Sequence, residues 1–429
     1  MGLLREPPGP GMWQTYRRLR GRPLREFPAF LRDVSRAHGP VTSFRVPWRR
    51  FYFLNDPAAI KDVLITHQHA FVKSEGTRAM RQLLGEGLVT SEEPLHRTMR
   101  RIVQPAFHRE RIASYEATMR DYASRWRAPE GIFDMHAQMM ELTLRIASTT
   151  LFGADAGEEA DRVGAALHEV VTIFPDVLGP LGSIVRRLPW GPAARFRRAR
   201  KILDDIVLRL IAQRRNSGED RGDALSMLLA SRDAETGQAM NDRQVRDEVM
   251  TLFVAGHETT ANALTWAWYL LAQHPDKRAV LQEALRQDAH PPYLDAVLNE
   301  TLRLYPPAWI LGRDATREVD AAGWRIRKGA TVLMSQLVMH RSPEFFTDAP
   351  QFCPERWLER PQLPAFAYFP FGGGSRKCIG DQFAWTEACI TLSTLASRYR
   401  FDLANEAEVA PDPVITLRPS GPVLMRALS

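Results

Sequence analysis

The chain has 429 residues, of which 45% are hydrophobic and 25% charged, and these are ordinary values for a globular protein. Three cysteines exclude a disulfide scaffold and an all-cysteine zinc site, and their odd number leaves at least one thiol without an intrachain partner. The net charge of +7 suits nucleic acid, an anionic membrane or an acidic protein as a partner, and charge alone does not choose among them.

The chain opens with a Pro- and Arg-rich lead, residues 1–40, which lacks the long apolar stretch of a secretory signal. We therefore expect a soluble, cytoplasmic protein whose lead holds an irregular stretch and a short basic helix. Residues 41–46 and 51–54 are rich in β-branched and aromatic side chains and predict two paired strands. Pro57 is expected to open a helix, because proline suits the first helical position.

The segment from about residue 94 to residue 215 has mostly helical periodicity, with breaks at 129–131 and at Gly153. Residues 175–192 mix Gly, Pro and apolar side chains and predict a long connection. Long loops often serve as lids, and an ordinary surface loop is the alternative.

A long helix is predicted from about residue 242 to residue 273. Its stretch 249–272 is mostly apolar and long enough to cross a bilayer or a whole domain. His257, Glu258 and Asn262 lie near the middle, where polar groups would be expensive in lipid. The segment is therefore expected to be a central buried helix.

Shorter elements are predicted for the last third of the chain. These are helices near 276–289 and 292–304, strands near 316–319, 324–326 and 330–334, an irregular stretch at 342–377, and a helix from about 379 to 398 followed by a β-like tail. The expected fold class is mainly α with a minor β region, in a single large domain at 41–429.

One cysteine stands at the mouth of a predicted helix, directly after a glycine-rich turn and two cations, in residues 371–380. Helix N-termini and neighbouring cations favour the thiolate, and glycines let a backbone approach a flat group closely. Cys378 has this setting. Cys389 falls in mid-helix, which is typical of a packed core thiol, and Cys353 has no local activation.

The same segment resembles the heme-binding loop of the cytochrome P450 family, whose pattern is Phe-x-x-Gly-x-Arg-x-Cys-x-Gly. The fixed positions are matched by Phe371, Gly374, Arg376, Cys378 and Gly380. The resemblance covers nearly the whole chain and is to soluble, bacterial-type members. It implies the cytochrome P450 fold, heme b as cofactor and Cys378 as the axial ligand of the heme iron.

A second match is the Glu-x-x-Arg pair Glu300 and Arg303, which share one helical face. In the family this pair forms a structural ion network with an Arg of a later Pro-Glu-Arg segment, here Arg356. By itself the pair would be read as a solvated surface pair. The resemblance implies a scaffolding role near the cysteine loop.

A third match lies on the long helix, where residues 255–260 resemble the oxygen-activation motif of the family. The resemblance implies that Thr259 binds oxygen and water and that Glu258 delivers protons. The alternative is that Thr259 only hydrogen-bonds its own helix. A zinc-protease motif is excluded, because it needs a second histidine where Ala261 stands.

A fourth match implies contacts to the heme propionates from His96 and Arg100, which share a helical face at i, i+4. Arg313 and Arg376 match two further propionate contacts. Charge-assisted hydrogen bonds of this kind suit carboxylates. Taken singly, each residue would more often be a surface charge.

No Gly-x-Gly-x-x-Gly loop for NAD(P) appears, and no length remains for a flavin or fused reductase domain. Electrons would then come from a separate protein, and the resemblance implies an acidic ferredoxin with its reductase. Basic residues could form its docking face by electrostatic complementarity. The candidates are Arg97, Arg100, Arg101, Arg109, Arg111 and Lys377, with the propionate role taking precedence at Arg100.

The sequence thus predicts a monooxygenase that inserts one atom of O2 into a lipophilic small molecule. Ala255, Ala308 and Ile310 are candidates for the substrate pocket, with core packing as the alternative. A faint similarity favours a terpenoid or carotenoid substrate over a fatty acid or polyketide.

A peroxide-driven oxygenase and a non-catalytic heme or ligand-binding protein are the alternative functions, and the Glu258–Thr259 pair argues against both. Nucleic-acid binding lacks a basic–aromatic module. We expect a monomer. Weak peripheral contact of the basic lead with a membrane surface is a further hypothesis.

Overall fold

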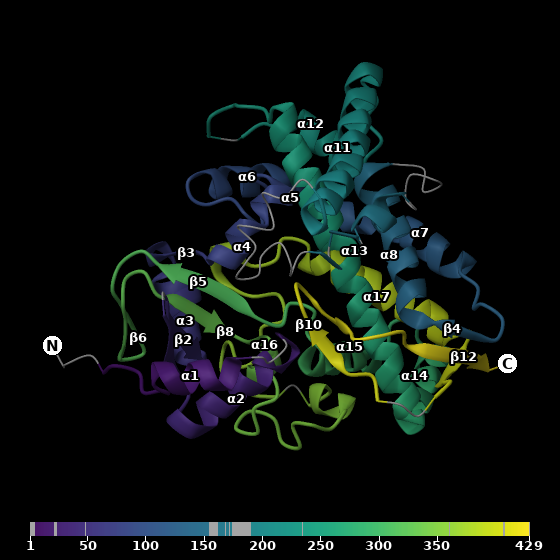
Figure 1. The fold of residues 1–429 in the computed structure, drawn as a ribbon. Coiled ribbons are helices and arrows are strands. Elements are labelled where there is room, and N and C mark those ends of the chain that lie inside the picture. Colours follow the sequence, from purple (N-terminus) through teal and green to yellow (C-terminus); the bar gives the residue numbers. More distant parts are fainter. Residues whose placement is uncertain are drawn as a thin grey trace. The chain divides into compact units, whose positions relative to one another are not determined.

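The structure is a computed structural model that describes residues 5–20, 24–47, 49–153, 162–167, 169–170, 172–173, 190–233, 235–359, 361–405 and 408–428. Long helices dominate it and short strands form small sheets, as predicted (Figure 1). The predicted loop at 175–192 falls outside the described residues, except for its last three positions.

The contacts divide the chain into two compact units. Unit 1 contains residues 1–75, 265–378 and 401–423, and unit 2 contains residues 76–264, 379–400 and 424–429. Each unit is assembled from three separated stretches, so neither is an independent segment of the sequence.

Unit 1 is built around a five-stranded sheet of order β1-β2-β8-β5-β3. Its strands are β1 (Val41–Val46), β2 (Arg49–Leu54), β3 (Phe71–Lys73), β5 (Leu311–Ala315) and β8 (Thr331–Met334). The pair β1–β2 is antiparallel, as the sequence predicts, and β2 pairs in parallel with β8 through a register that joins Phe51 to Thr331.

Both faces of this sheet carry apolar clusters, because alternate side chains of a strand point to opposite faces. Tyr52 and Val332 belong to one cluster, whereas their neighbours Phe53 and Leu333 belong to another. A strand buried on both faces reads as a continuous apolar run, which is why β2 was recognisable in the sequence.

Unit 1 also contains helices and two two-stranded ribbons. The helices are α1 (Met12–Leu19), α2 (Phe27–His38), α3 (Pro57–Lys61), α14 (Pro275–Gln287), α15 (Pro292–Leu304) and α16 (Gln336–Met339). The strands β6 (Val319–Ala321) and β7 (Trp324–Ile326) form one ribbon, and β10 (Pro411–Pro413) and β11 (Leu417–Pro419) form another.

Unit 2 is mainly helical. It contains α5 (Arg81–Leu84), α6 (Leu95–Val103), α7 (Arg109–Arg125), α8 (Met135–Phe152), α11 (Pro192–Ser217), α12 (Ala224–Ala230) and α17 (Asp381–Ala396). Strand β4 (Ile132–Asp134) pairs with β12 (Leu424–Leu428). Helices α7 and α17 pack together, with the ring of Phe383 against those of Phe107 and Tyr115.

Three elements pass from one unit to the other along the chain: α4 (Glu75–Ala79), α13 (Asp242–Gln273) and β9 (Arg400–Leu403). Helix α13 has the bounds that its sequence predicts, and it is largely buried. Its polar Asn262 is buried and hydrogen-bonds the ring of His136 at 3.0 Å. No helix within the described part of the chain is long and apolar enough to span a bilayer.

Two details of the prediction differ from the structure. The lead holds two helices, α1 and α2, where one was expected. Of the strand predicted at 316–319, residues 316–318 form an exposed bend between β5 and β6, and only Val319 lies in a strand, β6. The charged side chains of Arg313 and Asp314 are buried within β5, and they conceal the strand pattern.

Candidate active site

The cysteine loop is an irregular turn that leads into α17. The backbone N–H of Cys378 donates to the carbonyl oxygen of Phe371 at 3.0 Å, which closes the loop on itself. The thiol of Cys378 is exposed, whereas Cys389 is buried inside α17. Cys353 is half-buried, and its Sγ donates to a carboxylate oxygen of Glu355 at 3.5 Å. Of the three cysteines, Cys378 is therefore the one whose sulfur is most accessible to a bound group.

The glycines of this loop are required by close packing in unit 1. Gly374 has a φ of +72°, and a Cβ there would overlap the carbonyl oxygen of Leu64. The next residue, Ser375, donates its backbone N–H to the Gln68 side chain at 3.0 Å. At the far end of the motif, in unit 2, Gly380 is the N-cap residue of α17. The loop is thus held in one conformation by its neighbours.

Strand β3 brings two of the predicted propionate ligands together. Arg376 donates to the carbonyl oxygen of Phe71 at 3.2 Å, and Arg313 on β5 is paired in register with Lys73. Arg313 is buried and also donates to the Gly312 carbonyl at 2.9 Å. Two guanidinium groups thus belong to the same small region of unit 1 as the cysteine loop.

The predicted ion network forms in unit 1 and is fully buried at its centre. Glu300 and Arg303 have no exposed side-chain area, and two hydrogen bonds of 2.8 and 2.7 Å join them side by side. Arg356 and the Trp357 indole donate to the same carboxylate at 3.1 and 2.8 Å. Such a bidentate, multiply bonded pair is a rigid support and not a solvated surface pair.

The network also fixes the segment that precedes the cysteine loop. Arg303 donates to the backbone carbonyl oxygens of His340 and Ala349 at 3.0 and 2.7 Å. The buried His340 ring in turn accepts the backbone N–H of Phe369 at 2.9 Å. Burial, together with the charges of Arg303 and Arg341, lowers the pKa of His340 to about 3, so the ring is neutral and can accept this bond. Sequence reasoning missed His340.

Helix α13 is open to solvent at one point of its middle turns. Ala255 is exposed and Thr259 is half-exposed, whereas His257, Glu258 and Thr260 are buried. Ala255 and Thr259 are one turn apart and share a face. The Thr259 hydroxyl donates to the Ala255 carbonyl at 2.7 Å, which is the intrahelical bond of the alternative interpretation. It must rotate away from that oxygen before it can donate to a ligand.

A second carboxyl group lies beside this helix, and the sequence analysis missed it. Glu387 of α17 is completely buried, and burial raises its pKa well above the ordinary value. The nearby Thr260 hydroxyl opposes this rise only in part, and neither carboxyl oxygen has a hydrogen-bond partner among the described residues. Burial therefore favours the neutral, protonated form of this carboxyl. A lone carboxyl in the apolar run of α17 was the sequence signal for it.

We expect Glu387→Gln to reduce the pH dependence of stability. Because folding raises the pKa of Glu387, the stability of the parent protein falls by up to about 1.4 kcal/mol per pH unit as the pH rises from the unfolded pKa toward the folded one. Glutamine keeps the neutral form at every pH. Urea unfolding at pH 6 and pH 9 measures the difference, and an equal pH slope for both proteins would contradict it.

The other predicted propionate ligands lie on α6 in unit 2. His96 is buried, and its Nδ1 is 3.5 Å from a carboxylate oxygen of Glu93. Arg100 is half-buried one turn later. Of the predicted pocket residues in unit 1, Ala308 is exposed and Ile310 packs against two apolar clusters. The position of Ile310 resembles core packing more than a pocket wall.

The residues present in each unit fit the heme that the resemblance implies. Unit 1 supplies an exposed thiol on a glycine-rich loop and two guanidinium groups suited to carboxylates, one on the same loop and one on β5. Unit 2 supplies an open face at Ala255 and Thr259, in the largely buried middle of α13. A soft anionic ligand, cationic partners and bare backbone are the features that heme binding requires.

Comparison with known proteins identifies the family. The chain matches the family description "Cytochrome P450" over residues 7–425. It is 37% identical to cyclooctatin synthase of Streptomyces melanosporofaciens over 91% of this chain and 88% of the relative. Pentalenene oxygenase of Streptomyces avermitilis is 36% identical over 94% and 92%. Cyclooctat-9-en-7-ol 5-monooxygenase of Streptomyces melanosporofaciens is 37% identical over 85% and 83%.

The family match extends over nearly the whole chain, and each of these relatives is covered over more than four-fifths of its length. Members of this family use heme b with a cysteine thiolate on the iron. The chain therefore belongs to the cytochrome P450 family and is a heme-dependent monooxygenase.

Proposed function

We propose that this cytochrome P450 inserts one oxygen atom of O2 into a C–H or C=C bond of a terpenoid, with Cys378 as the axial ligand of the heme. The observation that carries the assignment of Cys378 is its exposed thiol at the end of a loop that Gly374 and Phe371 hold rigidly. Helix α17 begins three residues later, so its N-terminus favours the thiolate over the thiol.

Bound heme supplies the activation of dioxygen, and the thiolate promotes cleavage of the O–O bond by donating electron density. The role of this chain's own residues is to deliver protons and exclude bulk water. We assign proton donation to the Thr259 hydroxyl, once it has rotated off the Ala255 carbonyl. Glu258 is buried on the same helix and would resupply that proton through water.

Four cationic or hydrogen-bonding side chains would hold the heme propionates. These are Arg313 and Arg376 in unit 1 and His96 and Arg100 in unit 2. Guanidinium groups bind carboxylates through two parallel hydrogen bonds, which orients the ligand as well as neutralising it. The buried ion network of Glu300, Arg303 and Arg356 acts only through the segment that it fixes.

The substrate class is supported by the relatives. The names of three of them refer to cyclooctatin, cyclooctat-9-en-7-ol and pentalenene, which are terpenoid compounds. The exposed Ala255 and Ala308 offer small apolar side chains that suit a bulky hydrocarbon. We test the class by titrating the holoenzyme with terpenoids, fatty acids and macrolides and recording the spin-state change of the heme spectrum. Binding of fatty acids or macrolides but no terpenoid would overturn it.

Replacing Thr259 with Ala should uncouple oxygen consumption from product formation. The variant loses the hydroxyl that donates the proton, so we expect product per oxygen consumed to fall by about tenfold or more, with hydrogen peroxide released instead. Thr259→Ser keeps the hydroxyl and should restore coupling. Unchanged coupling in Thr259→Ala, or faster turnover with peroxide than with reduced ferredoxin, would favour a peroxide-driven enzyme.

We propose an acidic ferredoxin as the electron donor, docking on basic residues of α6 and α7 in unit 2. Arg97 and Arg109 are exposed there, and Arg111 is half-buried. Arg101 was also predicted for this face, but its guanidinium is 2.8 Å from Asp233 and 2.7 Å from Glu235. Its charge is already balanced, so we omit it from the docking face.

Reversing the charge at Arg109 should slow reduction of the heme. We expect Arg109→Glu to lower the reduction rate by an acidic ferredoxin several-fold at low salt, with the difference vanishing at high salt as the charges are screened. Arg243→Glu makes the same charge change at an exposed position on α13 and serves as the control. Equal rates for both variants at low salt would remove Arg109 from the docking face.

A further inference from the structure

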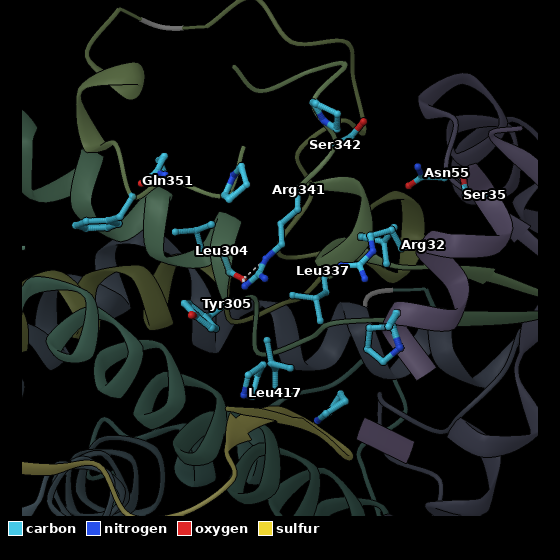
Figure 2. Close-up of a pocket in the computed structure, with 18 of the residues that line it drawn as sticks. Arg32, Ser35, Asn55, Leu304, Tyr305, Leu337, Arg341, Ser342, Gln351 and Leu417 are labelled. Atoms are coloured by element: carbon cyan, nitrogen blue, oxygen red, sulfur yellow. Dashed lines mark hydrogen bonds between the residues drawn. The ribbon is translucent and has the colours of Figure 1, made fainter. Parts of the chain in front are cut away.

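Unit 1 contains a cavity of about 720 Å³ that none of the predicted heme, catalytic or substrate residues lines (Figure 2). Its walls come from α2, the last turn of α13, the end of α15, α16 with the residues after it, and the β10–β11 ribbon. The volume lies within the range of small-molecule sites in proteins. The cavity is therefore large enough to hold a ligand of its own.

Arginine side chains dominate the charge of this cavity. Arg25, Arg32, Arg36 and Arg341 line it, against the single carboxylate of Glu344. Arg25 and Arg36 form no ion pair with any residue that the structure describes, and Arg32 has only a distant one, 3.7 Å from Asp33. A concave surface with this excess of positive charge attracts anions.

Arg341 is a cation of the cavity wall that its neighbours hold in place. Its Nε donates to the carbonyl oxygen of Leu304 at 3.0 Å, its Nη2 bonds the same oxygen, and its guanidinium lies 5.0 Å from the centre of the Tyr305 ring (Figure 2). That ring stacks on Trp266 at 4.0 Å. A guanidinium held in this way loses little freedom when an anion binds.

The surroundings of Arg341 disfavour its positive charge unless an anion binds beside it. Burial and the nearby charges of Arg303 and Arg32 lower its pKa, and no described carboxylate forms an ion pair with it. One edge of the Arg341 guanidinium has a structural role, because its Nε and Nη2 cap the last carbonyl oxygen of α15. Helix capping does not explain why Arg25, Arg32 and Arg36 converge on the same cavity.

The floor beside Arg341 is apolar. Leu337 and Leu417 lie below Arg341 in the view of Figure 2, and Leu270 and Val338 also line the cavity. A simple inorganic anion would leave these side chains uncovered. An apolar chain attached to the anion would cover them and gain about 25 cal/mol for each Å² removed from water.

We propose that this cavity binds an amphipathic oxyanion, whose carboxylate or phosphate group contacts Arg341 and Arg32 and whose apolar chain lies on Leu337 and Leu417. The site is separate from the oxygenase chemistry, so it does not depend on the identity of the substrate. A fatty-acid anion and a lipid phosphate present the same chemistry to it.

The proposal is tested by calorimetric titration of the holoenzyme with decanoate, decanol and inorganic phosphate, with decyl phosphate as the phosphate-bearing probe. We expect decanoate and decyl phosphate to bind, and decanol and inorganic phosphate to bind at least about tenfold more weakly, because each lacks one half of the interaction. The ratio of the two binding constants tells a carboxylate source from a phosphate source. If inorganic phosphate bound as tightly as decyl phosphate, the proposal of an amphipathic ligand would be wrong.

Variants separate this cavity from the heme site. Arg32→Gln removes an exposed charge and should weaken decanoate binding about tenfold, and Arg341→Leu should weaken it further, with the heme spectrum unchanged. Arg243→Gln makes the same charge change outside the cavity and should leave binding intact. An unaltered decanoate affinity in Arg32→Gln would overturn the proposal. So would decanoate binding that always accompanies a shift of the heme spectrum, because decanoate would then be bound at the heme site and not in this cavity.

Discussion

The Cys378→Ala protein will lack the red-shifted Soret band that thiolate-ligated heme gives in its reduced carbon monoxide complex, and it will form no detectable product. The reason is the loss of the only exposed thiol in the described structure at the N-terminus of a helix. Without the thiolate, the electron donation that promotes O–O cleavage disappears. The spectrum and the product yield of the purified protein measure both effects.

Cys389→Ala is the matched control. Cys389 is buried in α17, so its replacement leaves a small cavity and costs stability of about 1 kcal/mol, while the Soret band of the carbon monoxide complex keeps its position. The assignment of the axial ligand would be wrong if the Cys389 variant lost the red-shifted band and the Cys378 variant retained it.

Glu300→Gln should be the most destabilising single change outside the heme site. The Glu300 carboxylate accepts hydrogen bonds from Arg303, Arg356, the Trp357 indole and the Cys353 backbone, at 2.7–3.1 Å. An amide in its place replaces one acceptor oxygen by an NH2 group that faces other donors, and it leaves the Arg303 charge buried without its partner. Breaking a buried pair in this way costs about 3–5 kcal/mol.

Urea unfolding followed by circular dichroism measures this loss, with Glu116→Gln as the control. Glu116 pairs with Arg120 at 3.2 Å on the exposed face of α7, and such pairs contribute less than about 1 kcal/mol. A loss below about 1 kcal/mol in Glu300→Gln would mean that the network is dispensable. We also expect the Glu300 variant to retain heme less well, because Arg303 and His340 fix the segment before the cysteine loop.

The sequence was most informative where one local signal decides the structure. Helix α13 begins and ends where its periodicity changes, at Asp242 and Gln273. Strands β1 and β2 were visible because their apolar and aromatic residues cluster. Strand β5 was misplaced because Arg313 and Asp314 are buried charges, and burial of a charge depends on partners distant in sequence.

The same limit applies to the candidate site. Cys378 was singled out by its neighbours in the chain, whereas His340 and Glu387 have no local motif and become significant only through burial and through Phe369 and Thr260. Likewise, the role of the Thr259 hydroxyl at bound oxygen was predicted from a motif. Its present bond to Ala255 depends on a rotamer that no sequence pattern encodes.

The parallel pairing of β2 with β8 has a consequence for synthesis of the protein in the cell. Its register joins Phe51 to Thr331, so the β1–β2 hairpin leaves the ribosome long before its partner strand exists. At about 5–20 residues per second, translation takes on the order of tens of seconds to supply the missing edge. During that interval an apolar strand edge is exposed, and nascent chains of this enzyme should depend on chaperones to avoid aggregation.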